Sequence, residues 1–238
     1  MSVNARVAVV AFDAADIEAL TDFWTKLTGW EVTGRDDDWI TVRTGAGQDV
    51  AFQKAPDHVP PQWPGQEHPQ QFHLDLLVDG IEEAAQRAES LGATRLGAGA
   101  TWITLADPAG HPFDLCQRDG QGSATGLFAV TIDAPDASAL AHFYADVLQA
   151  EVTYDGPEGA MLGTEPLGVM FQQIEGYTAP QWPDPAHPQQ AHLDIAVDDL
   201  DDGEARVLEL GARRLDQGQW TWRVFADPAG HPFCLVTS

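Results

Sequence analysis

Apolar residues along this chain change from continuous short runs to helical spacing and back again. Residues 7–12 form an unbroken apolar run of strand length. The segment that follows places its apolar residues at i, i+3 and i+4 spacing, on one face of a helix: Ile17, Leu20, Phe23, Trp24 and Leu27. Asp16 stands where a helix N-cap belongs, and Gly29 stands where the helix should end. The pattern predicts a strand followed by an amphipathic helix.

The same order returns before the middle of the chain. Residues 72–78 read as a strand, Asp79 as a cap, and Gly92 as the end of a helix with an apolar stripe. Each helix is followed by short segments rich in β-branched and aromatic residues, which predict strands at 39–43, 49–53, 101–105 and 112–116. The unit is therefore strand, helix, then about three strands.

The second half of the chain repeats the first at an offset of about 120 residues. The tripeptide QWP at 62–64 returns at 181–183, and the run DPAGHPF at 107–113 returns at 227–233. Helices are expected near 137–148 and 200–210, and residues 119–125 form a polar linker. We predict an α+β protein with two tandem modules, 1–118 and 126–238, built from four βαβββ motifs in all.

Composition limits the classes of partner. Twelve Lys and Arg against 37 Asp and Glu give a net charge of −25, which repels nucleic acid and anionic lipid. The longest apolar runs are far shorter than a membrane span, and the N-terminus lacks a signal-peptide pattern. The two cysteines have no CxxC spacing, as in proteins of a reducing compartment, so a cytoplasmic protein is expected.

Tryptophan is abundant, with eight residues in the chain. Some must serve core packing and loop anchoring, but those that face a cavity would form flat walls for an aromatic or polycyclic ligand. Trp102 and Trp222 occupy equivalent positions in the two modules and are the first pair to consider. The other candidates lie on predicted strands or long loops: Trp39, Trp63 and Trp182.

Three local patterns, taken together, resemble the vicinal oxygen chelate superfamily of glyoxalase, bleomycin-resistance and dioxygenase-like proteins. They are the D…FW…LxGW opening at 16–30, the HLDLLVD and HLDIAVD strands at 73–79 and 192–198, and the DPAGHPF turn. The chain looks most similar to the actinobacterial branch with tandem glyoxalase-like domains. The resemblance implies that each motif curls its strands into a half-barrel and that two motifs close around a pocket.

The resemblance also implies where a divalent ion would bind. Metal-dependent members use a residue on the first strand of one motif, a histidine opening the next motif and a carboxylate on its last strand. The first position holds Val9 in one module and Ala129 in the other, and neither side chain can bind a metal. The histidine position is filled by His73 and His192.

The third metal position differs between the modules, with Asp114 in the first and Cys234 in the second. Gln53 and Gln172 are equivalent residues that could add an amide oxygen. A lone carboxylate such as Asp114 on an apolar strand is costly unless it is paired or faces a polar cavity. The thiol of Cys234 is either inert and buried, or reactive if a neighbouring imidazole lowers its pKa.

The leading interpretation is a protein that binds a small organic molecule in pockets whose metal positions have degenerated, with no resident metal. One alternative is an enzyme, a lyase, isomerase or dioxygenase, that uses Ni, Zn, Mn or Fe. The ion would be held by His73 with Asp114, or by His192 with Cys234, and completed by Gln53 or Gln172. Another is an interaction scaffold whose pockets have closed, because fold alone does not determine function. The motifs are expected to pair within one chain, as a pseudo-dimer, or between the chains of a homodimer.

Overall fold

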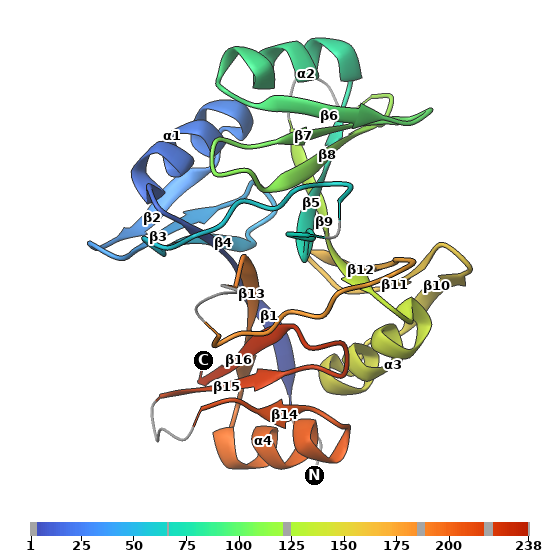
Figure 1. Cartoon of the computed structure of the whole chain (residues 1–238). Coiled ribbons are helices and arrows are strands. Elements are labelled where there is room, and N and C mark those ends of the chain that lie inside the picture. The colour runs from blue at the N-terminus through green and yellow to red at the C-terminus, as the bar shows by residue number, and fades with distance from the viewer. Residues whose placement is uncertain (1–3, 66, 121–124, 185–188, 217–220, 238) are drawn as a thin grey trace.

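The computed structural model describes residues 4–65, 67–120, 125–184, 189–216 and 221–237, which fold as four βαβββ motifs (Figure 1). The first motif contains β1 (Ala5–Ala14), α1 (Ile17–Thr28), β2 (Glu31–Arg35), β3 (Trp39–Arg43) and β4 (Asp49–Lys54). The second contains β5 (Phe72–Val78), α2 (Ile81–Ser90), β6 (Thr94–Ala98), β7 (Trp102–Ala106) and β8 (Pro112–Gln117). The third contains β9 (Gly126–Ala134), α3 (Ala137–Leu148), β10 (Val152–Gly156), β11 (Gly159–Leu162) and β12 (Gly168–Gln173). The fourth contains β13 (Ala191–Val197), α4 (Leu200–Glu209), β14 (Arg213–Arg214), β15 (Trp222–Ala226) and β16 (Pro232–Thr237).

The helix boundaries follow local capping chemistry. The Asp16 carboxylate accepts a hydrogen bond from the backbone N–H of Ala19, and Gly29 adopts the left-handed conformation with φ of 78°, so both predicted ends of α1 are confirmed. The predicted cap at Asp79 is wrong, because the N-cap of α2 is Gly80, which makes no side-chain capping bond. Instead, the Gln117 side-chain oxygen accepts the hydrogen bond of the Ile81 N–H.

Two eight-stranded sheets make up the fold, and each combines motifs from both sequence repeats. One sheet has the order β14-β15-β16-β13-β1-β4-β3-β2, and the other has the order β10-β11-β12-β9-β5-β8-β7-β6. The first strands of two motifs join antiparallel at the centre of each sheet, β1 with β13 and β5 with β9. The first motif thus pairs with the fourth and the second with the third, all within one chain.

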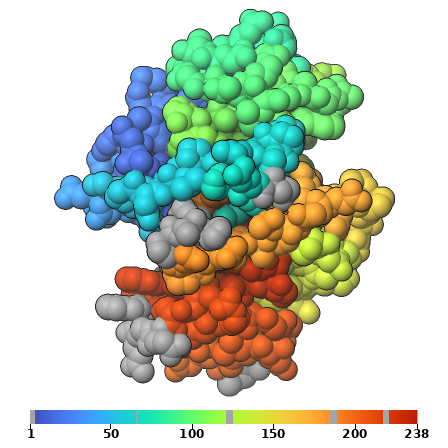
Figure 2. Space-filling view, in the orientation of Figure 1, coloured from blue at the N-terminus to red at the C-terminus, as the bar shows by residue number. Residues whose placement is uncertain are grey.

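The helices lie at the periphery of the molecule (Figure 1). In β13, the buried side chains of Leu193 and Ile195 alternate with those of His192 and Asp194, which point to the other face. The long segments that follow β4 and β12 cross the face seen in Figure 2, in cyan and orange. In the described part of the chain, no helix is both long and apolar enough to cross a membrane.

Candidate functional site

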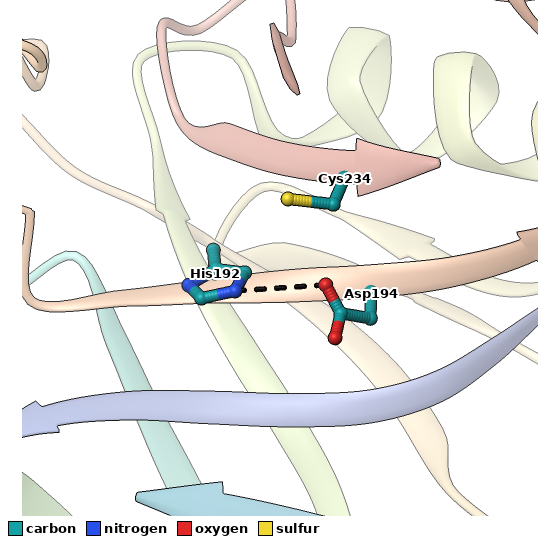
Figure 3. A group of neighbouring side chains, drawn as sticks. All are labelled: His192, Asp194 and Cys234. Carbon is teal, nitrogen blue, oxygen red and sulfur yellow. Dashed lines mark ion pairs between the residues drawn. The ribbon is translucent and has the colours of Figure 1, made fainter. Parts of the chain in front are cut away.

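A cluster of three potential ligand residues lies where β13 and β16 run side by side. His192 and Asp194 are two residues apart on β13 and therefore project to the same face. Nε2 of His192 lies 3.5 Å from Oδ1 of Asp194, and Cys234 is in register with Asp194 across the parallel strand pair. Figure 3 shows the three side chains converging from the two strands. One potential ligand atom of each lies within 4.8 Å of the others.

The equivalent cluster of the first repeat lies between β5 and β8. His73 and Asp75 share a face of β5, with Nε2 of His73 3.8 Å from Oδ2 of Asp75. Asp114 on β8 is in register with Asp75. These three residues also offer one ligand atom each within 4.8 Å of one another. The structure therefore holds two groups that could take part in binding a metal.

Each cluster opens into a pocket formed by two motifs. The Asp114 pocket, of about 550 Å³, lies between the second and third motifs, and the Cys234 pocket, of about 650 Å³, lies between the first and fourth. These volumes suit a drug-sized molecule. Pockets of this size do not fit the alternative of an interaction scaffold whose pockets have closed. The residues singled out from the sequence all line one of them: His73, Asp114, Gln172, Trp63 and Trp102 in the Asp114 pocket, and His192, Cys234, Gln53, Trp39, Trp182 and Trp222 in the Cys234 pocket.

Asp75 and Asp194 are among the site residues that the sequence analysis does not identify. Each lies two positions after the histidine of the HLD strand, so the alternation of a strand places it beside the imidazole. The strand reads as almost wholly apolar, and its single carboxylate belongs to the family pattern, so the sequence alone does not mark it as a pocket group. Trp102 and Trp222 remain 43% and 46% exposed, which places them at the pocket rims rather than at their floors.

Asp75 and Asp114 are buried to different effect at the floor of the Asp114 pocket. Burial raises the pKa of Asp75, although nearby His73 and a hydrogen bond from the Thr131 hydroxyl oppose this shift. Oδ1 of Asp114 is buried without a hydrogen-bond partner among the described residues. Such an atom is costly unless it gains a hydrogen bond, and a ligand that donates one or carries positive charge would satisfy it.

The cysteine thiols are held in their protonated form. Burial and the adjacent Asp194 carboxylate raise the pKa of Cys234 well above its ordinary value. Burial, with the charges of Asp75 and Asp114, raises the pKa of Cys116 to about 12. A reactive thiolate at Cys234 is therefore disfavoured, because nucleophilic cysteines need a lowered pKa.

A buried carboxylate and a buried amide stand behind each histidine. Nε2 of Gln70 lies 3.0 Å from Nδ1 of His73 and donates to the Asp133 carboxylate at 3.0 and 3.2 Å. In the other pocket, Nε2 of Gln189 lies 3.1 Å from Nδ1 of His192 and donates to Asp13 at 3.2 and 3.1 Å. Each carboxylate comes from the opposite sequence repeat to its histidine.

The donor types of the clusters suit a divalent ion, but the hydrogen bonding of the imidazoles does not. A histidine that binds a metal through Nε2 normally donates its Nδ1 proton to a carbonyl or carboxylate. Here Nδ1 of His73 and of His192 faces the amide NH2 of Gln70 and of Gln189 instead of a carbonyl or carboxylate oxygen. The acceptor that a metal-bound imidazole needs at Nδ1 is therefore missing, and the residues as arranged do not fit a bound metal.

The paired βαβββ motifs, each pair enclosing a pocket, define a protein of the vicinal oxygen chelate superfamily. The model of the glyoxalase-like domain matches the chain twice, at residues 9–116 and 129–236. The chain belongs to this glyoxalase-like family. No curated protein matches its sequence significantly.

Solved structures with the same fold are distant in sequence. Glyoxalase I from Zea mays is 19% identical, with a TM-score of 0.73, and the match covers 99% of this chain and 93% of that protein. A putative dioxygenase from Bacillus subtilis is 12% identical, with a TM-score of 0.62 and coverage of 97% and 84%. At such identities the similarity establishes the fold and not the chemistry.

Proposed function

We propose that the protein binds small organic cations with a flat aromatic part, one in each of its two pockets. The observation that carries the proposal is the shared composition of the pocket walls. Each wall combines aromatic rings with carboxylates, and neither includes a lysine or arginine among the described lining residues. A positive charge on a planar ring system satisfies both kinds of group.

The Asp114 pocket is lined by several aromatic side chains and by three acids. Trp63, Trp102 and Tyr154 provide ring surfaces, and Asp75, Asp114 and Glu158 provide carboxylates. The unpartnered Oδ1 of Asp114 is a natural acceptor for an ammonium or amidinium N–H.

The Cys234 pocket has the same character with a different floor. Its rings are Trp39, Trp182 and Trp222, and its carboxylates are Asp36 and Asp194. Because a thiol replaces the Asp114 carboxylate, this pocket has a less acidic floor, and we expect it to bind a given cation more weakly.

The charge of the whole chain supports the same class of ligand. A net charge of −25 attracts cations over long range and raises their local concentration at the pocket mouths. This attraction weakens as salt rises, so cation binding should weaken with ionic strength more than ring stacking alone would.

Equilibrium dialysis against two flat tricyclic probes of opposite charge tests the proposal. We expect 9-aminoacridine, a cation at neutral pH, to bind at two sites per chain, and 9-anthracenecarboxylate to bind about tenfold or more weakly. Trp102→Ala and Trp222→Ala should each weaken one site by about 1–2 kcal/mol, through loss of ring contact. Leu208→Ala is the matched control, because Leu208 is 42% exposed on α4 and lines neither pocket.

Two results would contradict the proposal. Equal binding of cation and anion would remove the role of the carboxylates. Cation binding that persists unchanged in the Trp102→Ala and Trp222→Ala double variant would place the site outside both pockets.

A divalent-metal enzyme of the lyase, isomerase or dioxygenase type is the second candidate. The donor types of the two clusters favour it, whereas the hydrogen bonding of their imidazoles does not. Metal analysis of protein purified without chelator separates it from the first. About one equivalent of Ni, Zn, Mn or Fe per cluster, lost in His73→Ala or His192→Ala, would support the enzyme and contradict the proposal of a protein that binds its ligand without a metal. Absence of metal, with no thermal stabilisation by added divalent ions, would sink the enzyme.

A further inference from the structure

The carboxylate, amide and imidazole behind each pocket form a chain that the fold builds twice. Asp133, Gln70 and His73 form one chain, and its counterpart consists of Asp13, Gln189 and His192. All six side chains are buried, with exposed fractions between 2% and 7%. A buried polar network that recurs in both halves needs every member satisfied, so its hydrogen-bond directions are well determined.

The carboxylate determines how the amide is turned. An ionised carboxylate only accepts hydrogen bonds, so the group of Gln70 that approaches both oxygens of Asp133 must be its NH2. Burial raises the pKa of Asp133 to about 6, against the hydrogen bond from Gln70, so the ionised form of this carboxylate predominates at neutral pH. The amide oxygen is thereby turned away from both Asp133 and the imidazole.

The amide in turn determines which ring nitrogen carries the proton. The Gln70 NH2 has two hydrogens, and with one directed at Asp133 the other is available to Nδ1 of His73, 3.0 Å away. Nδ1 can accept this bond only if the proton of the neutral ring is on Nε2. The Nε2–H then points into the pocket, where the Asp75 carboxylate lies 3.8 Å away.

We infer that Asp133 and Asp13 are positioning residues that, through Gln70 and Gln189, hold His73 and His192 as Nε2–H donors toward the pockets. Each imidazole can donate to a ligand oxygen or nitrogen, and it cannot bind a divalent ion until the amide turns over. The inference rests on the proposed function only for the statement that a ligand receives this hydrogen bond. The proton position itself is a property of the protein without ligand.

Multiple-bond ¹H–¹⁵N spectra of the imidazoles, recorded without ligand at neutral pH, test the proton position directly. His73→Gln and His192→Gln assign the two signals. We expect both rings to be Nε2–H in the unsubstituted protein. Asp133→Asn should convert His73 to the Nδ1–H form, because the asparagine NH2 can donate to a Gln70 oxygen that then also accepts from Nδ1–H.

The duplicated chain supplies the matched control. Asp133→Asn should leave His192 unchanged, and Asp13→Asn should convert His192 and leave His73 unchanged. A general loosening of the fold would disturb both rings together. Gln70→Leu, which removes the amide, is a second route to the same test and should leave His73 without a fixed proton position.

Titration with Co²⁺, followed by its visible absorption, provides an independent readout. Asp133→Asn should bind Co²⁺ about tenfold or more tightly than the unsubstituted protein, because Nε2 of His73 gains a free lone pair beside Asp75 and Asp114. Adding His73→Gln to this variant should abolish the gain in Co²⁺ affinity.

The two proposals fail separately. If 9-aminoacridine does not bind, the proposed function is overturned, and the proton position of the histidines is not affected.

Two results would overturn the inference. One is an Nδ1–H signal for His73 and His192 in the unsubstituted protein. The other is Co²⁺ binding through His73 that is equally strong with and without Asp133→Asn.

Discussion

Asp133→Asn should stabilise the protein at neutral and alkaline pH, because it removes a charge that folding buries at a cost. Asp133 is 2% exposed, and burial raises its pKa from 3.8 to about 6. The folded state therefore binds this proton more tightly than the unfolded state, so stability falls as pH rises through this interval. The pKa of Asp133 differs by about 2 between the folded and unfolded states, which corresponds to a destabilisation of the folded protein by about 3 kcal/mol. This destabilisation is fully present above about pH 6 and roughly half present at about pH 5.

Urea denaturation of both proteins at several pH values measures this effect. The stability of Asp133→Asn relative to the unsubstituted protein should rise by about 1.5 kcal/mol between about pH 5 and pH 8. Costs that do not depend on pH, such as a changed hydrogen bond to Gln70, cancel in this comparison. Asp37→Asn, at an exposed position, should show no such trend. A difference that stays flat, or that falls with pH, would refute the reasoning.

Three further predictions test individual contacts. Tyr144→Phe should cost about 1–3 kcal/mol in thermal unfolding, because the fully buried hydroxyl donates to the Asp227 carboxylate at 3.0 Å; an unchanged stability would contradict this account. The thiol of Cys234 should react with a disulfide reagent at neutral pH about tenfold or more slowly than in urea, and equal rates would contradict the raised pKa. Gly99→Ala should weaken 9-aminoacridine binding in the Asp114 pocket alone, because the added methyl group would clash with the Trp102 ring and displace it.

Local chemistry was readable from the sequence wherever neighbours along the chain decide it. The Asp16 cap and the Gly29 stop of α1 could be predicted because a helix end depends on a few adjacent residues. The Asp79 cap could not, since Gln117 satisfies the N–H of Ile81 from another strand. The capping rule considers only neighbouring residues, and here the hydrogen-bond acceptor comes from a residue far along the chain.

The candidate site was predictable in its residue types and less so in its assembly. His73 with Asp114, and His192 with Cys234, could be proposed from their positions in repeated motifs, and the structure brings each pair together. The adjacent carboxylates Asp75 and Asp194 were missed, although the period of a strand contains the information.

The sequence by itself determined the repeat, the four βαβββ motifs and the tryptophan-rich character of the pockets, because these follow from periodicity and composition. Only the tertiary structure decided that the first motif pairs with the fourth and the second with the third. Four similar motifs could pair in several ways, and the choice depends on which first strands fit against each other in space. The same pairing brings Asp133 to Gln70 and Asp13 to Gln189, across 63 and 176 residues of sequence. These contacts determine which ring nitrogen of each site histidine carries the proton, and no local sequence pattern predicts them.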